Sequence, residues 1–143
     1  MAIRKELLAE LTARREEAMA GGGLDKMEKR RKKGLLTARE RLDDLYDKGS
    51  LQELGMHVDH DTAGIDHKRL PGDGVVTGIG NVGGRPVAAF SQDFTVSGGS
   101  LGRMHSEKIC HMMETAASLG LPVVAINDSG GARIQEGVLS LSG

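Results

Sequence analysis

Aromatic residues and cysteine are scarce in this 143-residue chain. The aromatics are Tyr46, Phe90 and Phe94, too few for the stacking platforms that bind single-stranded nucleic acid. Cys110 is the sole cysteine, so no internal disulfide can form, and we interpret it as a buried thiol in a reducing compartment. No apolar run reaches the length that spans a bilayer. The formal net charge of −1 favours neither nucleic acid nor a membrane surface as a partner.

The N-terminus also lacks the features of a targeting segment, because acidic residues are mixed with its basic ones. We therefore expect a cytoplasmic protein. Zinc-type ligand spacing is absent too, and nothing supplies soft ligands, so we predict no metal site. The residues that invite a metal interpretation are instead expected to be polar loop residues: His57, Asp59, His60, Asp61, Asp66 and His67.

Glycine, by contrast, is abundant, with 21 residues, which is about twice the usual share of roughly 7%. The glycines lie beside apolar segments and indicate tight turns. Helical spacing of apolar residues predicts a first helix that ends at Gly21–Gly23. The cation run Lys29–Lys33 is expected to be solvated surface, with phosphate contact as the alternative. Thr37–Glu40 forms a capping box, which predicts a helix that Gly49 stops. We expect residues 1–50 to form an N-terminal helical segment.

From Gly72 onward the pattern favours strands. Residues 75–80 and 86–90 are two apolar runs joined by a glycine-containing turn, which predicts a β-hairpin. The glycines of this hairpin fit neither a P-loop nor a Rossmann fingerprint, because no helix follows them. A helix with an apolar stripe, Ile109 to Ala117, follows a second double glycine at Gly98–Gly99 and ends at Gly120. The order of elements predicts an α/β fold, with a ββα unit followed by a βα unit.

The segment Leu121–Gly137 holds the most informative pattern. Residues 123–126 are a β-branched run that predicts a strand buried on both faces. Turn-forming residues and Gly130–Gly131 follow, and then a run that favours a helix start at residues 132–136. Backbone N–H groups at such a junction lack intrahelical partners, and the glycines let a ligand oxygen approach them. Two interpretations are open: an oxyanion hole made of backbone, or an ordinary tight turn.

Side-chain catalysts are scarce in the sequence. It contains no Cys-His pair, no Gly-x-Ser-x-Gly elbow and no His-Glu-x-x-His motif, and no close carboxylate pair lies on the glycine loops. What remains is a set of backbone donors, which suit a reaction that develops negative charge on a carbonyl oxygen, such as formation of a thioester enolate.

Four segments together resemble the carboxyltransferase (β) subunit of biotin-dependent acyl-CoA carboxylases of the propionyl-CoA carboxylase type. They cover nearly all of the chain after Gly34, in the family's order: GLLTARERLDDLYDKGS (34–50), PGDGVVTGIG (71–80), GRPVAAFSQDFTVSGGSLGRMHSEKI (84–109) and LPVVAINDSGGARIQEGV (121–138). The resemblance implies a crotonase-like (ClpP/crotonase) ββα spiral, of which residues 51–143 would be an incomplete domain. The chain departs from the family at Ser97, where Phe is usual, and at Arg103, where an acidic residue is common.

The resemblance also implies residue roles and partners. Gly130 and Gly131 would stabilise the enolate oxygen of acyl-CoA as the catalytic backbone donors. Carboxybiotin on a separate carrier domain would supply the carboxyl group, so a biotin carboxylase or biotin carrier subunit and a homo-oligomeric assembly are expected. The residues expected to bind substrate are Gly98, Gly99, Ser100, Ser129 and Ala132.

Alternatives remain within and outside this family. A transcarboxylase subunit, or a decarboxylase acting on methylmalonyl-CoA or glutaconyl-CoA, fits the same residues. A crotonase-type hydratase fits less well, because neither glycine loop carries a carboxylate placed to handle the α-proton. The chain could instead be a non-catalytic assembly remnant whose helices dock a partner. Because family subunits are much longer, we expect a fragment that is inactive when it is alone.

Overall fold

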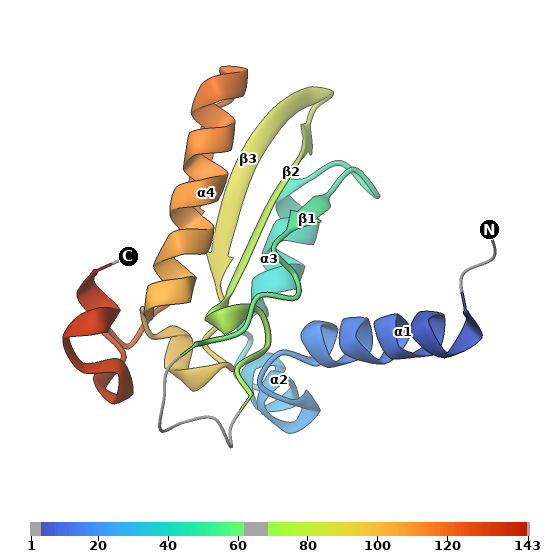
Figure 1. The fold of residues 1–143 in the computed structure, drawn as a ribbon. Coiled ribbons are helices and arrows are strands. Elements are labelled where there is room, and N and C mark those ends of the chain that lie inside the picture. Colours follow the sequence, from blue (N-terminus) through green and yellow to red (C-terminus); the bar gives the residue numbers. More distant parts are fainter. Residues whose placement is uncertain (1–3, 62–68, 143) are drawn as a thin grey trace.

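The computed structural model describes residues 4–61 and 69–142. Its first elements are three helices, which precede the strands in the chain. Helix α1 spans Lys5–Ala20 and ends at Gly21 as predicted, and α1 extends away from the body of the molecule (Figure 1). Helix α2, Leu24–Arg31, was not predicted. Three members of the cation run, residues 29–31, form its last turn, where positive charge offsets the negative end of the helix dipole.

Helix α3, Ala38–Leu45, begins at the predicted capping box. The Thr37 hydroxyl accepts from the Glu40 N–H at 3.3 Å, and the Glu40 carboxylate accepts from the Thr37 N–H at 2.7 Å. The prediction that Gly49 stops the helix is wrong, since the backbone becomes extended at Tyr46. Tyr46 leaves the helix to bury its ring, and its hydroxyl donates to the Val87 carbonyl at 3.1 Å.

Four strands form one sheet in the order β1-β2-β3-β4 among the described residues. Their bounds are β1 Gln52–Leu54, β2 Val75–Val82, β3 Arg85–Gln92 and β4 Val123–Ile126. The predicted hairpin is confirmed as the antiparallel pair β2–β3, with positive φ at both glycines of its turn. Helix α4, Arg103–Leu119, crosses over to β4, which runs parallel to β3. The predicted ββα and βα units are therefore present. Short 3₁₀ segments complete the chain: η1 Pro71–Gly74, η2 Ser97–Gly99 and η3 Ile134–Leu141.

The core lies on both faces of the sheet, because successive strand side chains point to opposite faces. Figure 1 shows α4 covering one face, with α3 behind the other. On the α4 side, Ala88 and Phe90 pack with Met112 of the helix. On the α3 side, Val87 and Ala89 pack with Leu42 and with the other members of that cluster, Ala38, Tyr46 and Val76. Helix α3 thus shares a core with the sheet. The predicted division into an N-terminal helical segment, residues 1–50, and a partial domain, residues 51–143, stays a prediction.

Strand β4 departs from the prediction of a strand buried on both faces. Among the strands that the structure describes it pairs with β3 alone, so no described strand covers its other edge. Along the strand, Val123 and Ala125 are exposed, while Val124 and Ile126 are half-buried. A strand at an open edge has neighbours on one side only, so the same apolar run that predicts burial here leaves side chains in contact with water.

Two further sequence predictions are wrong. No α-helix starts at residues 132–136. Ala132 instead forms a parallel bridge with Leu101, and the 3₁₀ segment η3 begins at Ile134. The extended bridge holds the backbone out of the helical region at this point. Cys110 is exposed, not buried, because it lies outside the face of α4 that carries Met112 and Ala116 into the core.

We predict that the isolated chain 1–143 is marginally stable and self-associates at micromolar concentration. Besides the open edge of β4, large apolar side chains are exposed, which promotes association. They include Leu119, Val123, Ile134, Val138 and Leu141. Sedimentation velocity together with a thermal melt provides the measurement. A Val138→Lys variant should shift the population toward monomer. A monomeric chain with a cooperative transition at about 45–65 °C, the usual range for small domains, would contradict this expectation.

Candidate active site

The two glycine loops that the sequence singles out lie against each other. The Gly130 N–H donates to the Gly98 carbonyl at 2.9 Å, and the Leu101 N–H donates to the Gly131 carbonyl at 2.8 Å. Close approach requires glycine on one side, since a Cβ at Gly99 would lie 2.2 Å from the Asp128 carbonyl oxygen. The structure therefore brings the two loops into contact, and a binding site at this contact stays a prediction.

The backbone donors of the turn at residues 129–132 differ in what they contact. The Gly130 N–H is already used by the Gly98 carbonyl. The Gly131 N–H contacts the Ser129 hydroxyl at 3.1 Å on an exposed surface. The Ala132 N–H donates to no group in the described part of the chain. A ligand oxygen could replace the Ser129 hydroxyl as the acceptor of the Gly131 N–H and leave the contact between the loops intact. The Gly130 N–H could bind a ligand only if its bond to the Gly98 carbonyl were broken.

The predicted substrate-binding residues on the other loop are held by local contacts. Gly98 and Gly99 belong to η2, which begins at Ser97. Ser97 has a positive φ of 49°, a conformation that is uncommon outside glycine. The Ser100 hydroxyl donates to the Ser97 carbonyl at 2.8 Å. The hydroxyl of Ser100 therefore stabilises its own loop. The backbone carbonyl of Ser100 accepts a hydrogen bond from a buried arginine.

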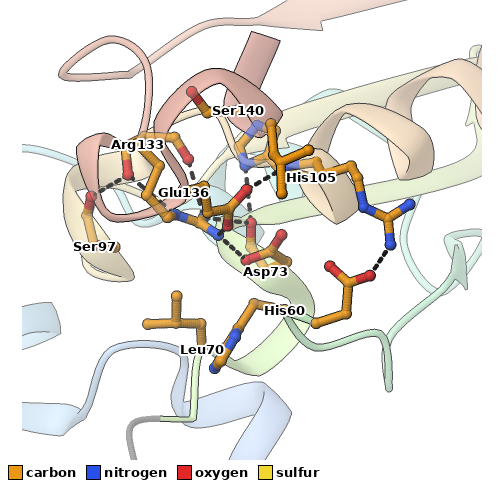
Figure 2. Close-up of polar contacts among 12 residues, drawn as sticks. His60, Leu70, Asp73, Ser97, His105, Arg133, Glu136 and Ser140 are labelled. Atoms are coloured by element: carbon orange, nitrogen blue, oxygen red, sulfur yellow. Dashed lines mark hydrogen bonds and ion pairs between the residues drawn. The ribbon is translucent and has the colours of Figure 1, made fainter. Parts of the chain in front are cut away.

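That arginine, Arg133, is the centre of a buried ion cluster that the sequence did not reveal. Figure 2 shows its guanidinium group between Asp73 and Glu136. The nitrogen–oxygen distances of these two ion pairs are 2.5 Å and 2.7 Å, and all three side chains are essentially inaccessible to water. The guanidinium also donates to the Ser100 carbonyl at 3.0 Å. Glu136 in turn accepts from the backbone N–H of Arg103, at the first turn of α4, at 2.7 Å. One guanidinium group therefore joins η1, the Ser100 loop and η3, and Glu136 links them to the start of α4.

Two buried basic side chains of α4 extend this cluster. His105 lies 2.8 Å from the Asp73 carbonyl and 3.3 Å from the Gln92 amide nitrogen. Burial lowers the pKa of His105 to about 4, so the imidazole is neutral near pH 7. Lys108 donates to the Gly72 and Val75 carbonyls at 2.7 Å and 2.5 Å, and burial lowers its pKa to about 8. Burial also raises the pKa of Asp73, against the opposing effect of Arg133.

The sequence contained a signal for these missed residues. His105 and Lys108 lie seven and four positions before Met112, so all three lie on one face of the helix. The interpretation of α4 from apolar residues alone overlooked the polar members of that face. Of the predicted apolar stripe, Met112 and Ala116 are buried, whereas Met113 is 47% exposed.

A cavity of about 510 Å³ borders the glycine loops on the side of α2. The Arg30 guanidinium lies 5.4 Å from the centre of the Phe94 ring and forms an ion pair of 2.5 Å with Asp128. Lys26 donates to the Thr95 carbonyl at 3.1 Å. The remaining lining residues are Lys29, Lys33, Leu35 and Gly98. A larger hollow of about 840 Å³, between α1 and β1, touches neither glycine loop. The smaller cavity is therefore the candidate ligand site.

The residues that invited a metal interpretation form no metal site in the described ranges 4–61 and 69–142, where no group of three or more His, Cys, Asp or Glu side chains could hold an ion. Asp59 instead accepts from the Leu70 N–H at 2.9 Å, and Asp61 pairs with Arg103. Asp66 and His67 lie outside the described residues. Nor does any helix in these ranges have the length and apolar character that crossing a membrane requires.

A family model and similar curated proteins point to the same protein family. The carboxyl transferase domain model matches residues 29–143. The propionyl-CoA carboxylase beta chain of Cereibacter sphaeroides is 54% identical over 141 residues, which are 97% of this chain and 28% of that relative. Methylmalonyl-CoA decarboxylase subunit alpha of Propionigenium modestum is 49% identical, covering 100% of this chain and 28% of that subunit. This chain therefore spans about 28% of the length of these curated relatives.

A solved structure agrees with the sequence relatives. The crystal structure of transcarboxylase 12S, a hexamer with methylmalonyl-coenzyme A and methylmalonic acid bound, has a TM-score of 0.93 and 48% identity, over 99% of this chain and 28% of that chain. This likeness confirms the crotonase-like α/β fold that the sequence resemblance implies. The roles of individual glycines stay predictions.

We predict that Arg133→Met destabilises the loops around the ion cluster by about 3–5 kcal/mol, because two buried carboxylates lose the guanidinium group that pairs with them. In a full-length protein that carries this segment, amide hydrogen exchange of residues 70–75 and 97–106 should then accelerate more than roughly 100-fold. Arg85→Met, on an exposed strand position, is the matched control and should leave this exchange unchanged. Equal protection in Arg133→Met and wild type would contradict the assigned role of the cluster.

We also predict that His105 makes the fold less stable as pH falls. The folded pKa of His105 is about 4, below the unfolded value of roughly 6.5. Between these two pH values the unfolded chain therefore binds a proton at His105 that the folded chain does not bind. The stability contributed by the neutral imidazole is complete above pH 6.5, and about 2 kcal/mol of it is lost by pH 5.

The melting temperature of wild type should therefore fall more between pH 7 and pH 5 than that of His105→Gln. His111→Gln, at an exposed position of the same helix, should keep the wild-type slope. If His105→Gln and wild type lose the same number of degrees, the imidazole does not titrate as its burial requires.

Proposed function

This chain belongs to the carboxyl transferase domain family, and we propose that it supplies the acyl-CoA side of a biotin-dependent acyl-CoA carboxyltransferase. The observation that carries the proposal is the contact between the two glycine loops beside the cation-lined cavity. The loops offer backbone donors for a thioester, and the cavity offers positive charge for phosphates. Both parts of an acyl-CoA thus have a matching surface within one site.

The thioester end would lie at the exposed turn of residues 129–132. An enolate oxygen there would be held by the N–H groups of Gly131 and Ala132, since the Gly130 N–H is engaged by the Gly98 carbonyl. Gly130 would contribute by joining the loops and by leaving room for the ligand. Backbone donors of this kind are each worth on the order of 10²–10³ in rate when they stabilise a developing oxyanion.

The CoA phosphates would lie in the cavity beside α2. Lys26, Lys29 and Lys33 line it together with Arg30, and ammonium and guanidinium groups form charge-assisted hydrogen bonds with phosphate oxygens. The Phe94 ring, 45% exposed, offers a flat apolar surface for the nucleotide base. Phosphate contact, which the sequence left as the alternative for the cation run Lys29–Lys33, is thus part of the proposed function.

We propose that the carboxyl group comes from carboxybiotin on a separate biotin carrier domain, loaded by a biotin carboxylase subunit. Approach from solvent is compatible with the exposure of the turn at residues 129–132. A homo-oligomer in the cytoplasm is proposed for the complete subunit. The oligomer is supported by the hexamer described for transcarboxylase 12S.

Propionyl-CoA is the substrate we favour, because the Cereibacter sphaeroides relative is a propionyl-CoA carboxylase chain. A decarboxylase or a transcarboxylase of methylmalonyl-CoA is the second candidate, supported by relatives at 49% and 48% identity. A hydratase is disfavoured, since Asp128 and Glu136 near the turn are held by Arg30 and Arg133 and no free carboxylate on these loops could exchange the α-proton. A non-catalytic remnant would bind no acyl-CoA at the glycine loops.

The test compares Gly131→Val with wild type in a full-length subunit that carries this segment, assayed for carboxyl transfer from carboxybiotin to propionyl-CoA. Gly131 has a φ of 108° and no protein atom within 4 Å of a built Cβ, so a side chain would occupy the space proposed for the thioester. We expect kcat per folded molecule to fall at least roughly 100-fold, with little change in the affinity for free CoA.

Gly84→Val is the control for backbone strain. Gly84 also has a positive φ and open surroundings, but it lies at the far end of the β2–β3 hairpin. It should lower the melting temperature and leave kcat unchanged. If Gly131→Val melts early yet keeps its rate, the glycine is structural. A wild-type subunit that transfers no carboxyl group would sink the proposed function itself.

A further inference from the structure

We propose that Asp128 is a positioning residue for the turn at residues 129–132, clamped by two arginines from the N-terminal helices. The inference rests on the proposed function and adds a role for α2 and α3 in the reaction. One oxygen of the Asp128 carboxylate accepts from Arg30 of α2 at 2.5 Å and from Arg41 of α3. Asp128 directly precedes the turn that carries the proposed backbone donors.

The backbone of Asp128 is fixed as firmly as its side chain. Its N–H donates to the Gln92 side-chain oxygen at 2.9 Å, and Gln92 in turn contacts His105. Its carbonyl oxygen lies against Gly99, where no Cβ would fit. The N–H and the carboxylate of this residue are hydrogen-bonded and its carbonyl packs against Gly99, so three different segments set the direction in which the chain enters the turn.

The two guanidinium groups are partly shielded from water, which strengthens their hold. The side chains of Arg30, Arg41 and Asp128 are 12%, 19% and 24% exposed. Ion pairs between fully exposed side chains contribute little, whereas truncation of one partner in a shielded pair leaves the other charge poorly solvated. Two cations meeting one carboxylate also leave a positive excess beside the turn, which favours an anionic thioester enolate nearby.

Position matters because backbone donors act only within a narrow geometry. A displacement of about 1 Å in a catalytic group costs on the order of 100-fold in rate, and donors must be held to within roughly 0.5 Å. A turn with two adjacent glycines has little stiffness of its own. The clamp on Asp128 therefore supplies, from outside the turn, the order that Gly130 and Gly131 cannot supply.

Arg41 is the residue that tests this role cleanly. Arg30 also lines the cavity proposed for CoA, whereas Arg41 does not. Arg39 provides a matched control on the same helix, since its side chain is 15% exposed and pairs with Glu53 at 3.0 Å, away from the glycine loops. Arg39→Gln and Arg41→Gln each remove one shielded ion pair from α3, but only Arg41→Gln removes a contact with Asp128.

The experiment measures kcat, the KM for propionyl-CoA and the Kd for free CoA in the full-length subunit. Arg41→Gln should lower kcat at least 10-fold, with KM and Kd changed less than 2-fold. Arg41→Lys, which keeps the charge, should recover part of the lost kcat, and Arg39→Gln should keep the wild-type kcat. Asp128→Asn should lower kcat, and the Arg41→Gln/Asp128→Asn double variant should be no slower than the slower single variant.

An Arg41→Gln subunit with wild-type kcat, or one in which only KM rises, would overturn the clamp. If Arg41→Gln fails to fold, Asp128→Asn decides, because a kcat equal to wild type in that variant would overturn the clamp as well. The proposed function fails separately, through a wild-type subunit without carboxyl transfer.

Discussion

The arrangement of this protein depends on one buried guanidinium group. Arg133 is completely inaccessible to water and meets two carboxylates, Asp73 and Glu136, that are inaccessible as well. Burial of these charges is costly unless each is paired and hydrogen-bonded. The structure meets that requirement by bringing together η1, the Ser100 carbonyl, η3 and, through Glu136, the first turn of α4. The bridge between Leu101 and Ala132, and with it the meeting of the glycine loops, is built on this frame.

The site divides its tasks between backbone and side chains. The groups proposed to act on the thioester are N–H groups of a glycine turn, which have fixed polarity and need no proton exchange. The charged side chains nearby are committed to one another: Arg133 to two carboxylates, and Arg30 and Arg41 to Asp128. This division explains why a search for side-chain catalysts in the sequence finds few. The proposed arrangement would suit carboxylation, decarboxylation and transfer of a carboxyl group alike if each uses an acyl-CoA enolate, and the relatives at 48–54% identity include all three kinds of protein.

Helices α2 and α3 contribute residues to the core, to the Asp128 clamp and to the cavity. Helix α3 contributes Leu42 to the core and Arg41 to the Asp128 clamp, while α2 places its cations along the cavity beside Gly98. The carboxyl transferase match begins at residue 29, inside α2. The last part of the described chain contains β4, which pairs only with β3 among the described strands, and η3, whose large apolar side chains are exposed.

The sequence by itself determined many of the local elements, though not helix α2 or the end of α3, and it determined the family. Capping at Thr37, the hairpin at Gly83–Gly84 and the end of α4 at Gly120 follow from the preferences of neighbouring residues, so they could be predicted. The pairing of Arg133 with Asp73 could not, because the two residues are 60 positions apart and no local pattern marks a buried charge. The same holds for the exposure of β4 and for the missing helix after Gly131. Burial and partner choice depend on which distant segments meet, and only the tertiary structure decided that.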